Sequence, residues 1–262
     1  MSLKDIRKLI LSAENKLETP EQFVNDFEMA IKMLDREGKD KPSQSYKPSS
    51  LNCIRQMYYG MVGSNQTDVE ESCNLIRICE SGTDAHERIQ FVISEMKRLG
   101  FECEYLDVGD YIKEYNIPDI KIIKKSGFET KLKHKKLKLR FLCDGLIRYK
   151  GELYILEIKT ESTYKHGSRI FVAEEHRSQG TAYCSALLLN KVLYLYEDRN
   201  SCGHKAYILP VTDEMKHRLV IDKIADCEEY VKNKCLPPKP EKVFASTCKY
   251  CDYATLCKEN KQ

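Results

Sequence analysis

The spacing of apolar residues predicts helices in the first hundred residues. One or two amphipathic helices are expected over residues 3–36, followed by a polar connection at 37–49 that contains two prolines. A short helix is expected after Cys53. Two further helices are expected over 69–80 and 84–99, with a break at Ser81-Gly82-Thr83 between them.

The second of these two helices has the clearest periodicity. Thr83 is a candidate N-cap, and Gly100 follows the expected C-terminal end. Its apolar stripe, which should face the core, consists of Ala85, Ile89, Val92, Met96 and Leu99.

Beyond residue 100 the pattern changes to short apolar runs that favour strands. Strands are expected over 101–108 and 118–124, and more strongly over 137–149 and 152–160. The predicted order continues with a helix over 174–189, strands over 192–197 and 205–211, and a long helix over 213–233. This order predicts an α/β fold with a central mixed β-sheet flanked by helices.

Composition narrows the class of protein. A chain of 262 residues with 42% hydrophobic and 32% charged residues is typical of a globular protein with a sizeable core. It has no run of 18 apolar residues, and its N-terminus lacks the apolar core of a signal peptide. The sequence therefore favours a cytoplasmic protein that does not enter a membrane. Residues 1–47 are expected to form a helical segment and linker, and residues 48–262 one domain.

A hairpin in the middle of the chain brings charged residues together. If Lys150-Gly151 is a two-residue loop, Tyr149 pairs with Glu152, and the same register places Asp144 opposite Glu157. Directly opposed residues share a face of the sheet. Lys159 lies two residues beyond Glu157 and shares that face.

Two carboxylates this close in an apolar hairpin repel each other, so one must be protonated or both must bind a cation. A hard divalent ion with oxygen ligands meets that need and leaves positions for water and phosphate. Lys159 could then act on the attacking water or offset charge on the phosphate. The alternative is an exposed Glu–Lys surface pair with an unrelated aspartate.

Cysteine is abundant, with twelve in the chain. In a reducing compartment most of these should be buried small residues, as expected for Cys79, Cys143, Cys184 and Cys227. A second group differs, because its spacing is Cys-x2-Cys-x5-Cys among charged residues and suits a metal centre. That group comprises Cys248, Cys251 and Cys257, with Cys53 as the candidate fourth ligand. The spacing leaves zinc and an iron–sulfur cluster both open.

The segment from Lys121 to Arg140 is strongly basic. It contains nine Lys or Arg residues and one acidic residue, Glu129, and it leads into the predicted strand that carries Asp144. Such a stretch is either a solvated face or a surface that binds the phosphates of a nucleic acid. The candidate DNA-binding residues are Lys131, Lys133, Lys135, Lys136 and Lys138.

Together these motifs resemble the PD-(D/E)xK nucleases, in particular the iron–sulfur branch of Cas4-like proteins and of RecB- and AddB-type nuclease domains. The resemblance covers about residues 48–260 and follows the family's order. It rests on Pro48–Arg55 with Cys53, Gly82–Glu87 with His86, Asp144, Glu157-Ile158-Lys159, Gln179-x3-Tyr183 and the terminal cysteines. One departure is Cys143, where the family has proline. Taken singly, His86, Gln179 and Tyr183 would be ordinary polar residues.

The resemblance implies a restriction-endonuclease-like core whose C-terminal tail is stapled by a [4Fe–4S] cluster on the four cysteines. It implies Mg²⁺ or Mn²⁺ held by His86, Asp144, Glu157 and the Ile158 carbonyl. Lys159 would be catalytic, and Gln179 and Tyr183 would position the DNA strand.

The implied function is an exonuclease that acts on DNA ends, with single-stranded DNA favoured over duplex ends. It would serve recombination or repair, phage DNA metabolism or CRISPR adaptation, with a possible partner protein from one of those systems. The oligomeric state stays open. The alternatives are a DNA-binding or adaptor protein with an unused catalytic site, and a zinc-stabilised binding module.

Overall fold

The computed structural model describes residues 5, 20–38, 44–64, 73–241, 243–249 and 251–260. The chain divides into two compact units, the smaller formed by residues 1–41 and 70–80 and the larger by residues 42–69 and 81–262. Within the described part of the chain, no helix has the length and apolar character needed to cross a membrane.

The smaller unit contains helix α2 (Pro20–Gly38), which confirms the later part of the helical segment predicted at 3–36. The earlier part, except Asp5, lies outside the described residues. Ile31 packs with Cys73 and Ile76, and the Cys73 thiol donates a hydrogen bond to the Glu28 carbonyl at 3.0 Å.

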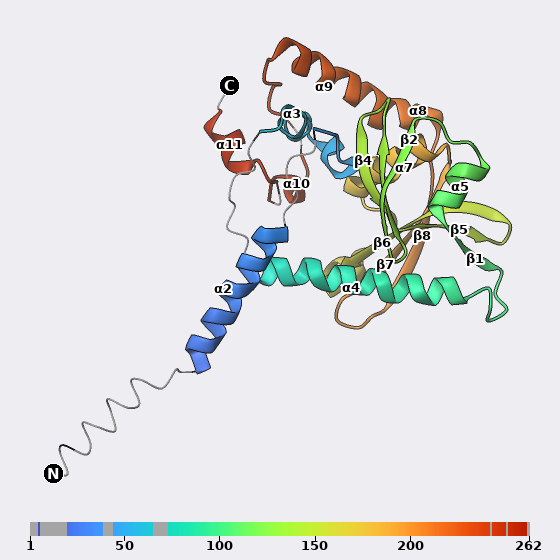
Figure 1. The fold of residues 1–262 in the computed structure, drawn as a ribbon, viewed down its shortest axis with the longest axis horizontal. Helices are drawn as coiled ribbons and strands as arrows, with labels where there is room; N and C mark the ends of the chain where they lie inside the picture. The colour runs from blue at the N-terminus through green and yellow to red at the C-terminus, as the bar shows by residue number, and fades with distance from the viewer. Residues whose placement is uncertain are drawn as a thin grey trace. The chain divides into compact units, whose positions relative to one another are not determined.

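The larger unit is built on a five-stranded sheet with the order β1-β5-β6-β7-β8 (Figure 1). Strands β6 and β7 are parallel, and the other neighbours are antiparallel. The predicted central mixed sheet is therefore confirmed. Its strands are β1 (Cys103–Leu106), β5 (Gly145–Tyr149), β6 (Glu152–Glu161), β7 (Lys191–Asp198) and β8 (His204–Pro210).

A second, antiparallel sheet has the order β2-β3-β4, formed by β2 (Ile120–Ser126), β3 (Glu129–His134) and β4 (Leu139–Cys143). The strand predicted over 137–149 is wrong as one element, because the chain leaves one sheet after Cys143 and enters the other at Gly145. Strand β3 was not predicted. Its one strongly apolar residue, Leu132, is buried between polar neighbours, so the segment looks like a loop in the sequence.

Helices cover both faces of the five-stranded sheet (Figure 1). Alternate residues of β5 and β6 point to opposite faces, as the period of a strand requires. One face packs on helix α4 (Cys73–Glu95), in a cluster with Ile89, Ile93, Ile147, Leu156 and Ile158. The other packs on helix α7 (Glu174–Leu187), in a cluster with Leu146, Ile155, Ala182, Tyr183 and Leu187.

Helix α4 corrects two predictions. It continues through Gly82 without the predicted break, so Thr83 is not a cap. The stripe is also different: Ala85, Ile89 and Ile93 are buried, whereas Val92 and Leu99 are exposed. Leu99 lies beyond the end of the helix. Ala85, Ile89 and Ile93 are four residues apart and therefore share the face that packs on the sheet, whereas Val92 is one residue off this spacing and does not point to that face.

The remaining helices complete the larger unit. A 3₁₀ turn (Pro48–Asn52) precedes α3 (Ile54–Val62), which confirms the short helix expected after Cys53. Helix α5 (Val108–Glu114), capped by Asp107, was not predicted. The helix predicted at 213–233 is confirmed as α8 (Asp213–Lys216), a π-helical turn (His217–Ile221) and α9 (Asp222–Asn233). The other helices are α6 (Thr163–Ser168), α10 (Ala245–Lys249) and α11 (Ala254–Glu259).

Candidate active site

The β5–β6 hairpin has the register that the sequence predicts. Tyr149 pairs with Glu152, and the ladder continues to Gly145 opposite Leu156. Lys150 and Gly151 have φ values of 49° and 81°, as a two-residue loop with two left-handed positions requires. One step beyond the ladder, an Asp144 carboxylate oxygen accepts a hydrogen bond of 2.8 Å from the Ile158 N–H. Asp144 therefore lies beside the Glu157-Ile158 segment.

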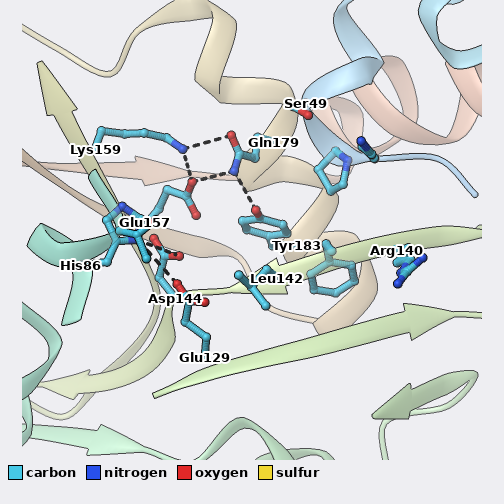
Figure 2. Close-up of a pocket in the computed structure, with 14 residues that line it drawn as sticks. Ser49, His86, Glu129, Arg140, Leu142, Asp144, Glu157, Lys159, Gln179 and Tyr183 are labelled. Carbon is cyan, nitrogen blue, oxygen red and sulfur yellow. Dashed lines mark hydrogen bonds and ion pairs between the residues drawn. The ribbon is translucent and has the colours of Figure 1, made fainter. Parts of the chain in front are cut away.

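Four predicted residues form one hydrogen-bonded network (Figure 2). Glu157 Oε1 lies 2.5 Å from the Lys159 ammonium and accepts a bond of 2.6 Å from the Gln179 amide. The Gln179 carbonyl oxygen accepts from Lys159 at 3.2 Å, and its amide also donates to the Tyr183 hydroxyl at 2.7 Å. Gln179 and Tyr183 lie one turn apart on α7, so this helix holds the Glu157 carboxylate through the Gln179 amide.

Glu157 is deeply buried, with 1% of its surface exposed. Burial, which Lys159 opposes and the neighbouring Asp144 charge reinforces, raises the pKa of Glu157 to about 7 in total. Its second oxygen, Oε2, is buried and has no hydrogen-bond partner among the described residues. A buried carboxylate oxygen without a partner is costly unless a cation or a ligand binds it.

His86 of α4 faces the same aspartate. Its Nδ1 lies 3.4 Å from Asp144 Oδ1 and 3.8 Å from Glu129 Oε1. Burial by itself would lower the pKa of His86, but the two carboxylates raise it to about 10. One donor atom from each of the three side chains can be chosen so that all lie within 4.8 Å of one another. An imidazole nitrogen and carboxylate oxygens fit a divalent cation such as Mn²⁺.

These residues line a cavity of about 370 Å³ (Figure 2). One wall is aromatic, because the Phe141 ring stacks on Tyr183 with their centroids 5.1 Å apart. Lys47 and Arg140 also line it. The cavity thus combines a carboxylate end with an aromatic wall and basic side chains.

Two further residues hold the backbone at Asp144. The Gln90 amide donates to the Asp144 carbonyl at 2.6 Å, and the Tyr105 hydroxyl lies 2.7 Å from the same oxygen. Sequence reasoning missed both. Gln90 could have been noticed, because it is a polar residue one turn after His86 beside the buried Ile89. Tyr105 carried no such signal. Glu129 was noticed only as the one acid in a basic stretch.

The predicted basic residues separate into two groups. The register pairs Lys131 with Leu142 and Lys133 with Arg140, and Leu142 and Arg140 line the cavity. Lys131 and Lys133 therefore share a face of the smaller sheet with the cavity wall. Lys135, Lys136 and Lys138 lie in the turn after β3, where Lys138 pairs with Glu228.

The C-terminal tail lies against α3, but among the described residues the sulfurs of the four predicted cluster cysteines do not form a group of ligand atoms within 4.8 Å of one another, as His86, Glu129 and Asp144 do. Arg55 is buried and donates hydrogen bonds to the carbonyls of Pro237 at 2.9 Å and Asn260 at 3.0 Å. Burial raises the pKa of Cys53, and charge on Cys257 and Cys248 raises it further. Burial likewise raises the pKa of Cys251 to about 11, with added contributions from Cys53 and Cys257.

The other cysteines mostly match the prediction. Cys143, Cys184 and Cys227 are buried, as expected. Cys79 is exposed, and that prediction is wrong, because the whole stretch 77–81 of α4 is exposed.

Comparison with known proteins gives structural likenesses. No family model matches the chain, and no curated protein matches it. The crystal structure of SSO0001 matches with a TM-score of 0.49 and 16% identity, over 92% of this chain and 98% of that one.

Two structures of LHK-Exo also match. The complex of LHK-Exo with dAMP has a TM-score of 0.39 and 12% identity, over 74% of this chain and 92% of that one. The alkaline exonuclease LHK-Exo from Laribacter hongkongensis has a TM-score of 0.38 and 14% identity, over 73% and 93%. The residues of the site, rather than these likenesses, carry the function proposed below.

Proposed function

We propose that this protein is a metal-dependent DNA exonuclease of the PD-(D/E)xK type. One observation carries the proposal: Asp144, Glu157 and Lys159 meet at the end of one hairpin and line one cavity, and Glu157 has a buried oxygen that finds no partner within the described part of the chain. A structural ion pair would not need the second carboxylate, and it would not leave a buried oxygen without a partner.

Mg²⁺ or Mn²⁺ would be held by His86, Asp144, Glu157 and the Ile158 carbonyl. Such an ion, when bound, lowers the pKa of a water ligand and offsets charge on the phosphate. Lys159 lines the same cavity, and the Gln179 carbonyl and Glu157 fix its ammonium. Lys159 is thereby placed either to orient the attacking water or to offset charge on the scissile phosphate.

The DNA strand would reach the cavity along the face that carries Lys131 and Lys133. Arg140 lies on that face and lines the cavity, whose inner wall includes the buried Phe141–Tyr183 pair. A cavity of about 370 Å³ lies at the lower end of the range for ligand sites, and we expect it to take a single nucleotide of the strand. These features favour cleavage at DNA ends, with single-stranded DNA as the substrate.

The tail would be held by a [4Fe–4S] cluster on Cys53, Cys248, Cys251 and Cys257. Its role would be structural, because it would join α3 to a segment about 200 residues later and so close a long loop. We place the enzyme in the cytoplasm, where thiols stay reduced. Its setting would be recombination, repair, phage DNA metabolism or CRISPR adaptation, with a partner from that system.

The test is release of nucleotides from end-labelled single-stranded DNA with Mg²⁺ or Mn²⁺. Glu157→Gln and Lys159→Met should each lower cleavage by about a hundredfold or more. Glu152→Gln is the matched control, because Glu152 lies on the same strand but is exposed and pairs with Lys191. The assay is repeated with each metal and with the label at either end of the strand, so that cleavage of either polarity would be detected. If wild-type protein binds the DNA under all of these conditions but never cleaves it, the protein is instead a binding or adaptor protein.

A further inference from the structure

Asp144 lies between two strands and has a glutamate on each side. The β5–β6 register, extended by one residue, places Glu157 opposite it. The β3–β4 register pairs Thr130 with Cys143, so the same extension places Glu129 opposite Asp144 on the other side. The crossing from one sheet to the other thus brings three carboxylates together.

Tyr105 holds the backbone at Phe128, the residue before Glu129, and so helps to fix the position of Glu129. The Tyr105 hydroxyl lies 3.0 Å from the Phe128 carbonyl and 2.7 Å from the Asp144 carbonyl. The Phe128 ring packs edge-on against Tyr105, with centroids 5.4 Å apart. One residue of β1 therefore fixes the backbone before Glu129 and the backbone at Asp144.

We propose that Glu129 is a further cation ligand, acting with His86 and Asp144. Their donor atoms lie within 4.8 Å of one another, and the Glu129 side chain is three-quarters buried. The inference rests on the proposed function, since the same ion would serve the nuclease. It adds a fourth side chain, from the smaller sheet, to His86 of α4 and to Asp144 and Glu157 of the hairpin region.

Two observations favour a cation here. Three carboxylates that line one cavity repel one another; His86 lies beside Asp144 and Glu129, and Lys159 beside Glu157. Independently, the buried Glu157 Oε2 has no partner among the described residues, and Glu157 lines the same cavity. The competing explanation is that Glu129 only forms an ion pair with protonated His86.

Mn²⁺ binding separates these explanations without any measurement of cleavage. Free Mn²⁺ would be titrated by electron paramagnetic resonance, and water-proton relaxation would report the waters on bound Mn²⁺. The proteins are wild type, Glu129→Gln and the control Glu104→Gln, whose carboxylate lies on β1 and pairs with Lys97. Circular dichroism checks the fold, and Glu129→Asp, which keeps the charge, serves if the glutamine variant does not fold.

We expect Glu129→Gln to weaken Mn²⁺ binding on the order of tenfold and to leave an additional water on the ion, while Glu104→Gln matches wild type. Wild-type affinity in Glu129→Gln overturns the inference. Weaker binding with an unchanged number of waters also overturns it, because Glu129 would then act from outside the coordination shell. A wild-type protein that binds no Mn²⁺ defeats the proposed function itself, and the two failures are thus distinguishable.

Discussion

Gly145 is the residue whose replacement should disturb the site most directly through packing. A Cβ at this position would lie 2.5–2.7 Å from three atoms of the Tyr105 ring and hydroxyl, closer than carbon atoms approach without displacement. Tyr105 would have to move, and its hydroxyl would leave the Asp144 and Phe128 carbonyls. Gly145→Ala therefore tests how the carboxylates are held together.

The magnitude follows from two contributions. Overpacking of a tight site costs roughly 1–3 kcal/mol. Loss of a hydrogen bond by the Tyr105 hydroxyl adds about 0.5–1.5 kcal/mol. Gly145→Ala should therefore lower the free energy of unfolding by roughly 1.5–4.5 kcal/mol, which corresponds to a fall in Tm of roughly 3–18 °C for a domain of this size. Mn²⁺ binding should weaken as well, because Asp144 and Glu129 both depend on the displaced ring.

The assay is thermal unfolding followed by circular dichroism, performed without oxygen. The matched control is Gly167→Ala in α6, where no atom of the described residues, apart from those of its chain neighbours and its own helix backbone, lies within 4 Å of the added methyl group. Because alanine is the better helix former, this change should be neutral or slightly stabilising.

A double-mutant cycle with Tyr105→Phe sharpens the test. In the Gly145→Ala background the Tyr105 hydroxyl has already lost its partners, so its removal should cost little further stability. Full additivity of the two changes, or an unchanged Tm in Gly145→Ala, would refute the reasoning.

Three other predictions concern the tail, the basic face and a buried histidine. Protein purified without oxygen should contain iron and acid-labile sulfide, and Cys251→Ala should lose both and become less soluble; a colourless zinc-containing wild type would contradict this. Replacing Lys131 and Lys133 together by glutamine should weaken DNA binding and flatten its dependence on salt concentration. Replacing Lys138 by glutamine should do so less, because Lys138 already pairs with Glu228. Equal salt dependence in the two variants would argue against DNA binding along the face that carries Lys131 and Lys133. Burial lowers the pKa of His176 to about 2, so the folded state stays unprotonated while the unfolded state gains a proton below about pH 6.5. The contribution of His176 to the free energy of unfolding should therefore fall by about 1.4 kcal/mol for each pH unit below that point. Urea unfolding at a series of pH values should show that the free energy of unfolding of His176→Asn falls less steeply with decreasing pH than that of wild type.

Local chemistry in the sequence was enough to predict the hairpin that brings Asp144 beside Glu157. Lys150-Gly151 determines a two-residue loop, and the loop determines the register, so the position of Asp144 beside Glu157 follows from residues within about fourteen positions of each other. The Gln179–Tyr183 pair needed only the period of a helix. The alternation of helices and strands likewise predicted the mixed sheet.

The tertiary structure decided what depends on distant segments. The run from 137 to 149 looks like one strand, and only packing against two different sheets divides it at Asp144. That division brings Glu129 to the site, in a strand too polar to be recognised from its sequence. Tyr105 and Gln90 reach Asp144 from β1 and α4, across 39 and 54 residues. Contacts of this kind depend on how sheets and helices pack against one another, and they cannot be predicted from the pattern of residues that are neighbours in the sequence.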